Sequence, residues 1–222
     1  TLYDSFGGGA YRDEWPELLF LLGDQVYVDE ASPATRARIR AKRDTSEPPG
    51  EEVVDFEEYT WLYQESWRDP LIRWLFSTVS TSMVWDDHDM SDDWNISRSW
   101  HEEMNRKEWW HERAIAGIMS YWIYQHLGNL SPRDLDEENE VYARVRGNPD
   151  ATGALYEWAK SIDSTAAGTR WSFCRDIDGV RAIFMDSRAA RVLTRERRSM
   201  FDDEVWDWIV GHTDGDFDHL LI

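Results

Sequence analysis

Two apolar runs in the chain each end in acidic residues. The first covers residues 18–22 and is followed by Gly23 and Asp24. The second lies in "STVSTSMVW", residues 77–85, and is followed by "DDHD", residues 86–89. Short apolar runs closed by turn residues predict buried β-strands. Since ligands of open α/β sheets bind beyond the carboxyl ends of the strands, the pattern predicts a site where these two strands end.

Helical patterns lie between and after these runs. Ser32 before Pro33, and Asp55 three residues before Glu58, are typical helix starts. The longest helical spacing, over residues 99–127, carries an apolar stripe that we interpret as core. The predicted helices cover about residues 34–43, 56–67, 70–76, 99–127, 154–161 and 202–212, and a polar loop is predicted over residues 131–153.

The second half of the chain contains a hairpin signal at Asp178-Gly179, between the β-rich segments 169–177 and 180–188. Residues 218–222 predict one more strand. Strands alternating with helices predict an α/β fold. We expect a single domain over residues 1–222, with helical insertions at about 32–76 and 99–161.

Composition narrows the possible functions. A formal net charge of -20 argues against nucleic acid as a partner, because phosphate backbones require a basic surface. No apolar run approaches the roughly 20 residues of a membrane span. Residues 1–15 carry no recognisable signal peptide, but the chain starts at Thr1, so its natural N-terminus is expected to be missing and the compartment stays open. Cys174 is the single cysteine, which excludes a disulfide within the chain; we expect it to be a small buried side chain.

The acidic residues at the two strand ends suggest metal chemistry. Carboxylates together with a histidine and a tyrosine make an oxygen-rich site that suits magnesium, calcium, manganese or ferric iron. Carboxylates held close together repel one another, and a bound cation relieves that repulsion. The residues therefore favour a metal-assisted hydrolase. For Asp92 and Asp93 we favour helix capping or water contacts instead.

Two other classes of protein stay open at this point. A chain rich in acidic residues and tryptophan could be a glycoside hydrolase, which uses two carboxyl groups and no metal. It could also be a non-catalytic homologue that keeps the scaffold and binds a cation. Sensitivity to a chelator separates the glycoside hydrolase from the metal enzyme, and metal binding without turnover would identify the non-catalytic homologue.

Four segments resemble one known family. "LLGDQVYVDE", "MVWDDHDMSDDWN", "SYWIYQHLGNLSP" and "FMDSRAARVL" occur in this order and together resemble alkaline phosphatase D (PhoD-like) enzymes of the metallophosphatase superfamily. The resemblance implies an α/β fold of two packed sheets flanked by helices (αββα). It also implies hydrolysis of small phosphate esters, monoesters or diesters, at a binuclear or multinuclear metal centre.

The resemblance assigns roles to individual residues. Asp24 would bridge two metal positions, and Tyr27 would give a phenolate to ferric iron, with calcium or another divalent cation at the second position. Asp87 would be a metal ligand, and Asp86 is a weaker candidate for the same role. His88 would be the catalytic residue that contacts phosphate or protonates the leaving group, which its intrinsic pKa near neutrality allows.

The chain departs from the family pattern at both ends. One metal motif of the superfamily precedes GDxxY, but residues 1–12 offer Asp4 without an apolar strand around it. A histidine-bearing GDxH motif comes from C-terminal strands. "GDFDHLLI" imitates its letters but corresponds to an earlier strand. We therefore expect a fragment from the middle of a PhoD-like domain, incomplete at both ends.

Two groups of basic residues lie near the motifs. Arg188 and Arg191 follow the strand that ends at Asp186, and we favour surface ion pairing over phosphate contact for both. The run of Arg36, Arg38, Arg40, Lys42 and Arg43 could attract an anionic substrate, but a solvated helix face is the favoured interpretation.

Overall fold

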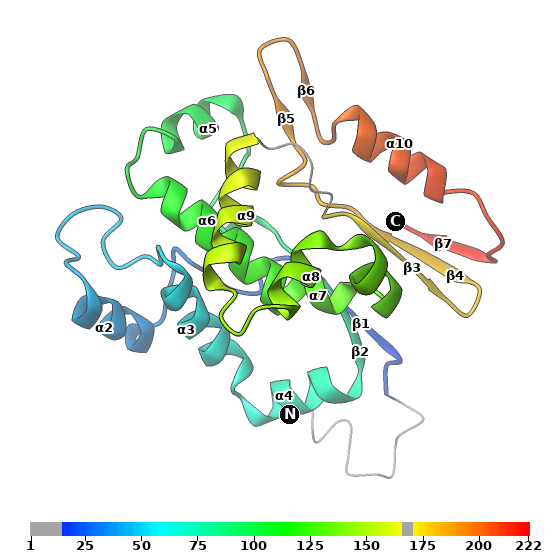
Figure 1. The fold of residues 1–222 in the computed structure, drawn as a ribbon, viewed down its shortest axis with the longest axis horizontal. Helices are drawn as coiled ribbons and strands as arrows, with labels where there is room; N and C mark the ends of the chain where they lie inside the picture. Colours follow the sequence, from blue (N-terminus) through cyan, green and yellow to red (C-terminus); the bar gives the residue numbers. More distant parts are fainter. Residues whose placement is uncertain (1–14, 166–170) are drawn as a thin grey trace.

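The computed structural model describes residues 15–165 and 171–222 (Figure 1). Its strands are β1 Leu18–Leu22, β2 Ser80–Val84, β3 Phe173–Ile177, β4 Val180–Phe184, β5 Val192–Leu193, β6 Arg198–Ser199 and β7 His219–Leu221. Its helices are α2 Pro33–Lys42, α3 Phe56–Trp67, α4 Pro70–Thr78, α5 Arg98–Met104, α6 Trp110–Tyr121, α7 Leu127–Asn129, α8 Glu140–Arg146, α9 Thr152–Thr165 and α10 Asp203–His212. A 3₁₀ turn, η2 Asp87–Asp89, and two π-helical segments, η3 Trp122–His126 and η4 Asp134–Glu138, complete the list.

The strands form two sheets that pack against each other, besides the small β5–β6 ribbon. β1 and β2 are parallel, with Leu22 paired to Val84, so both strands end at the same edge. The other sheet has the order β3-β4-β7, with β3 antiparallel and β7 parallel to β4. Phe20 of β1 meets Phe184 of β4 edge to face, at 4.9 Å between ring centroids. The α/β class is thus confirmed.

The helices lie on both sides of this pair of sheets. In Figure 1 most of the helical region from α2 to α9 lies to the left of the sheets, and α10 lies above the β3-β4-β7 sheet. The largest core cluster is rich in tryptophan and joins β2, the loop after it, α6 and α9. No helix in the described ranges is both long and apolar enough to cross a membrane. The proposed division into a core with two helical insertions stays a prediction.

Local signals place several helix starts and turns correctly. The Ser32 side chain accepts a hydrogen bond from the backbone N–H of Thr35 at the start of α2, as an N-cap does. Asp55 and Asp69 cap α3 and α4 in the same way. The Asp178-Gly179 turn joins β3 to β4, with both residues at positive φ. These predictions are confirmed. Each of them depends only on residues that are neighbours in the chain, and such signals can be read from a single sequence.

The single helix predicted over residues 99–127 is wrong. The chain forms α5, turns after Met104, and resumes as α6, whose last turn passes into η3. In one continuous helix Trp100 and Trp110 would lie about 15 Å apart along the axis. Instead their rings meet at 5.3 Å, because the half-buried Trp100 packs against the core cluster that contains the buried Trp110. The apolar stripe itself is core, as predicted.

Two smaller expectations are also corrected. The segment 131–153 is not only loop, because it contains η4 and α8. Asn139 caps α8 by accepting from the N–H of Tyr142, and Val141 anchors the helix in the core. Cys174 is half-buried rather than a buried filler, since it lies on the sheet strand β3 with its sulfur 4.0 Å from Asp176 Oδ1.

Candidate metal centre

The ends of β1 and β2 approach each other closely. Gly23 and Asp24 follow β1 with positive φ angles of 118° and 53°. A Cβ atom on Gly23 would collide with Cβ of Asp86, which follows β2 after Trp85. Glycine is therefore required here both for its backbone conformation and for the lack of a side chain. This close approach carries the carboxylate of Asp24 to the acidic segment after β2.

The structure brings the predicted carboxylates together. Asp24, Asp86 and Asp87 each offer an oxygen atom within 4.8 Å of the others. Burial, followed by the charges of Asp86 and Asp87, raises the pKa of Asp24 above its usual range. Such a shift is the expected sign of carboxylates that repel one another in a partly desolvated place.

Tyr27 and His88 lie beside this cluster. Their rings stack with centroids 4.5 Å apart, and the Tyr27 side chain stays partly open to solvent. The charge of Asp24, followed by burial, raises the pKa of Tyr27. A bound cation acts on the pKa of a phenol in the opposite direction, so a metal at this place would favour the anionic form of Tyr27. The backbone N–H of His88 points to Asp24 Oδ1 at 3.3 Å.

Asp29 orients the His88 ring and was missed in the sequence. Its carboxylate lies 3.0 Å and 3.1 Å from Nδ1 of His88 and also accepts the backbone N–H of Asp92 at 2.8 Å. Burial alone would lower the pKa of His88, but Asp29, with smaller effects of Asp24 and Asp87, raises it overall. The hydrogen bond at Nδ1 leaves Nε2 as the nitrogen available for chemistry. The signal that could have found Asp29 is its position in "GDQVYVD", just after the first motif.

Asp92 and Asp93 lie at the rim of the cluster. Asp92 Oδ1 is 3.9 Å from Nε2 of His88, and together with Asp87 these residues form a second group with metal-binding spacing. Asp92 is largely exposed, and Asp93 donates its backbone N–H to Asp87 Oδ2 at 2.9 Å. The interpretation of both side chains as capping or solvent-facing groups stays a prediction.

Arg188 enters the cluster from the end of β4. Its Nε bonds to Asp86 Oδ1, and its Nη2 lies 2.8 Å from Asp87 Oδ1. The guanidinium is mostly buried, so the predicted ion pairing occurs inside the candidate site and not on the surface. Asp186, a wholly buried carboxylate, accepts the N–H groups of Arg188 and Ala189 and thereby fixes the loop that carries Arg188.

Asp89 supports the same loops from within the core. It accepts the N–H groups of Gln25 and Val26 at 3.1 Å and 3.3 Å, and that of Asp86 at 3.0 Å. Burial raises the pKa of Asp89 to about 7, while the hydrogen bonds from Asp86, Val26 and Gln125 act against that rise. The sequence does not indicate this role of Asp89, because nothing in the acidic run distinguishes a buried aspartate from its neighbours.

The donor set fits a hard cation. Three carboxylates, a phenol and an imidazole converge, and only one guanidinium in the described part of the chain pairs with them. After burial, the charges of Asp86 and Asp87 still raise the pKa of Asp24, although Arg188 pairs with both of these aspartates. Oxygen ligands of this kind suit calcium, magnesium, manganese or ferric iron.

Most side chains of the basic run in α2 are exposed, and several of them pair with neighbouring side chains. Arg40 pairs with Glu51 at 2.7 Å, and Lys42 pairs with Asp55 at 2.6 Å. Arg38 stacks on the ring of Trp61 at 4.1 Å. The run is thus a solvent-facing helix surface, as predicted, on which acidic and aromatic neighbours contact several of the side chains.

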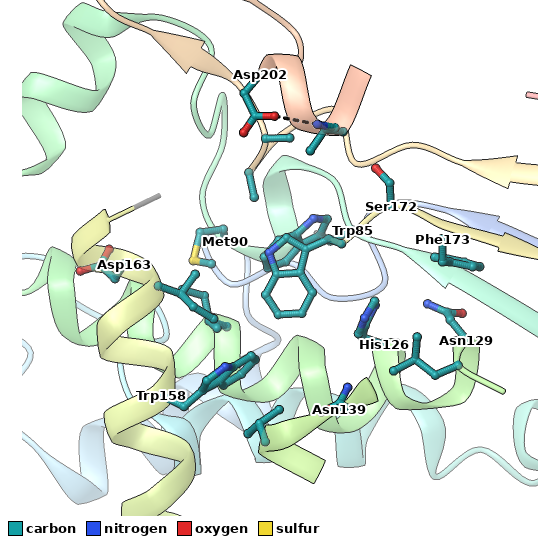
Figure 2. Close-up of a pocket in the computed structure, with 18 of the residues that line it drawn as sticks. Trp85, Met90, His126, Asn129, Asn139, Trp158, Asp163, Ser172, Phe173 and Asp202 are labelled. Carbon is teal, nitrogen blue, oxygen red and sulfur yellow. Dashed lines mark hydrogen bonds between the residues drawn. The ribbon is translucent and has the colours of Figure 1, made fainter. Parts of the chain in front are cut away.

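A large cavity in the described structure lies elsewhere. It measures about 790 Å³ and is lined by indoles and polar side chains, among them Trp85, His126, Asn129, Trp158 and Ser172 (Figure 2). None of the predicted site residues lines it. Trp85 faces the cavity and donates its Nε1–H to Asp186 at 3.0 Å. The acidic cluster and the cavity are thus two separate features.

The comparisons with known proteins identify the family. A model of the PhoD-like phosphatase family matches residues 3–151. The chain therefore belongs to the PhoD-like phosphatase family. A solved structure described as "Structure of PhoD" is similar in fold, with a TM-score of 0.55, 14% sequence identity and 91% of this chain covered. The chain spans 35% of that structure's length. No curated protein matches the chain.

Proposed function

We propose that this chain forms part of the metal centre of a phosphatase and that the centre hydrolyses small phosphate esters, monoesters or diesters. The observation that carries the proposal is the convergence of Asp24, Asp86 and Asp87 within 4.8 Å, with Tyr27 and His88 beside them. Membership of the PhoD-like phosphatase family supports it.

The residues would hold cations as follows. Asp24 offers an oxygen within 4.8 Å of those of both Asp86 and Asp87, and it would bridge two metal positions. Tyr27 would coordinate ferric iron, and Asp87, with Asp86 as the weaker candidate, would hold calcium or another divalent cation. When bound, such cations lower the pKa of a coordinated water toward about 7 and neutralise charge on phosphoryl oxygens.

His88 would act as the general acid. Its Nδ1 faces Asp29, so Nε2 is the atom that can carry a proton to the leaving-group oxygen. Because Asp29 raises the pKa of His88, the ring keeps that proton closer to neutral pH than an isolated imidazole would. The proton moves from Nε2 to the ester oxygen as the phosphorus–oxygen bond breaks. Tyr27 packs against the ring and limits its rotation.

The test is metal content by elemental analysis, for the unmodified chain and for Asp24→Ala. We expect near-stoichiometric metal in the unmodified chain and its loss in the variant. Asp207→Ala, in an exposed carboxylate of α10 outside the cluster, is the matched control and should retain metal. Full retention of metal in Asp24→Ala would rule out the bridging role.

Turnover separates the remaining classes. Hydrolysis of chromogenic phosphate mono- and diesters that stops on chelation and returns with metal supports the phosphatase. Chelator-insensitive cleavage of glycosides would support the glycoside hydrolase alternative, for which two carboxyl groups suffice. Metal binding without turnover would indicate a non-catalytic homologue or a chain that needs further segments of its domain.

A further inference from the structure

A π-helical segment connects the helical region to the candidate metal centre. In η3, Trp122–His126, the wider turn directs Gln125 into the core, where its side chain is 1% exposed. Its Nε2 donates to Asp89 Oδ1 at 3.1 Å and to the hydroxyl oxygen of Tyr63 at 2.8 Å. Its Oε1 has no hydrogen-bond partner in the described part of the chain. The amide therefore acts there only through its nitrogen. Short π-helical turns inside α-helices are frequent at functional sites.

The partner of Gln125 bridges the two loops that carry the candidate ligands. Asp89 Oδ1 also accepts the N–H groups of Gln25 and Val26, which follow Asp24. Asp89 Oδ2 accepts the N–H of Asp86. One buried carboxylate thus joins the loop after β1 to the turn after β2. With Gln125 included, it receives four N–H donors, which satisfies a carboxylate that would otherwise be costly to bury.

We infer that Asp89 and Gln125 are positioning residues of the metal centre: Asp89 fixes the separation of the Asp24 and Asp86 loops, and Gln125 fixes Asp89. The inference rests on the proposed function, because it concerns affinity for the cation. Neither side chain is placed to bind the cation, since both are buried and Asp89 has its oxygens occupied by N–H groups. Their effect passes through the backbone of the ligand loops.

Coupling of this kind is reciprocal. If Gln125 favours the ligand geometry, a cation that binds this geometry must stabilise the hydrogen bonds of Gln125 in return. Cation binding should therefore slow amide hydrogen exchange in η3, on the far side of Asp89 from the ligands. A merely structural glutamine would show no such response.

The experiment measures the Kd of calcium and of manganese(II) by calorimetry, in the unmodified chain and in three variants. Gln125→Met keeps the length of the side chain and removes the N–H donor, and Asp89→Asn removes the acceptor for Asp86. Both should weaken cation binding about 10-fold, as the loss of groups that orient metal ligands does. Tyr63→Phe is the matched control. It removes the other hydrogen bond of Gln125 and keeps the ring that stacks on Tyr124, so it should lower the melting temperature and leave Kd unchanged.

The outcomes separate this inference from the proposed function. Unchanged Kd in Gln125→Met and Asp89→Asn, with binding lost in Asp24→Ala, would overturn the positioning role alone. Absence of cation binding in the unmodified chain would overturn the metal centre and this inference with it. If Gln125→Met does not fold, hydrogen exchange of the unmodified chain decides. Slower exchange in η3 on adding calcium supports the inference, and unchanged exchange despite binding contradicts it.

Discussion

Nη2 of Arg188 lies 2.8 Å from Oδ1 of Asp87. A guanidinium at the end of β4 thus pairs with a candidate metal ligand that follows β2. The same guanidinium bonds to Asp86. A buried carboxylate that loses its partner is costly, and within the described residues Arg188 is the guanidinium that pairs with both aspartates. A metal ion and Arg188 would thus share the neutralisation of the same carboxylates.

Replacing Arg188 should therefore change both stability and the response to cations. In chelator-treated protein, Arg188→Met should reduce the free energy of unfolding by about 2 kcal/mol, because Asp86 and Asp87 lose charge-assisted hydrogen bonds. Calcium should then raise the melting temperature more in the variant than in the unmodified chain, since the ion restores the missing positive charge. Thermal unfolding with and without calcium measures both effects. Arg188→Lys keeps the positive charge, so its calcium-induced rise in melting temperature should lie between those of Arg188→Met and the unmodified chain. Equal rises in all three proteins would contradict the idea that Arg188 and a metal ion neutralise the same carboxylates.

Gly23 should tolerate no side chain. Alanine at this position would meet Cβ of Asp86 and adopt a φ of 118°, so Gly23→Ala should lose about 1–3 kcal/mol of unfolding free energy and weaken cation binding. Gly211→Ala is the control, because a Cβ there meets nothing within 4 Å and the residue lies in α10. That change should stabilise the helix by up to about 1 kcal/mol. Urea unfolding of both variants checks the contrast, and a Gly23→Ala protein as stable as the unmodified chain would disprove the close approach.

The sequence predicts local features of this protein better than distant ones. The helix start at Ser32 and the turn at Asp178-Gly179 follow from neighbouring residues. The position of carboxylates just after the two strands is also visible in the local sequence. The break between α5 and α6 depends on the packing of Trp100 against Trp110, which no local preference encodes.

Some features of the candidate site can likewise be predicted from the sequence, and others are visible only in the structure. The pattern of apolar runs predicts carboxylates at the two strand ends, and the family resemblance assigns metal-ligand roles to Asp24 and Asp87 among them. The pairing of Asp29 with His88 joins residues 59 positions apart, and that of Arg188 with Asp87 joins residues 101 positions apart. Contacts at such separations depend on how the sheets and loops assemble, so a single sequence indicates the residue types without indicating the partners.

The pKa of His88 should depend on Asp29. In chelator-treated protein, Asp29→Asn should lower this pKa, because the carboxylate at 3.0 Å is the main influence that raises it. Asp92→Asn, with its carboxylate 3.9 Å from the ring and largely exposed, should have a smaller effect. NMR titration of the ring protons measures both variants. An unchanged pKa in Asp29→Asn would show that the pair does not form in solution.

The pairing of Asp29 with His88 also determines in which direction the free energy of unfolding changes with pH. The folded-state pKa of His88 lies above its ordinary value of 6.5, so its contribution to stability is fully present below 6.5 and is lost as pH rises through the folded-state pKa. Asp29→Asn should remove this part of the pH dependence. Denaturant unfolding at a series of pH values across that interval, compared with Asp92→Asn, isolates the contribution of Asp29.

Tyr27 should determine the colour of the iron-loaded protein. A phenolate bound to ferric iron absorbs visible light, so Tyr27→Phe should lose that band if Tyr27 is the ligand. Phenylalanine keeps a ring to stack on His88, which lies 4.5 Å away, and the fold of the loop should survive. Tyr142→Phe, in α8 and outside the cluster, is the control and should keep the band. The band should appear only with iron, because a phenolate without bound iron does not absorb visible light. A spectrum unchanged in Tyr27→Phe would exclude this tyrosine as a ligand and leave the aspartates as the anionic donors of the site.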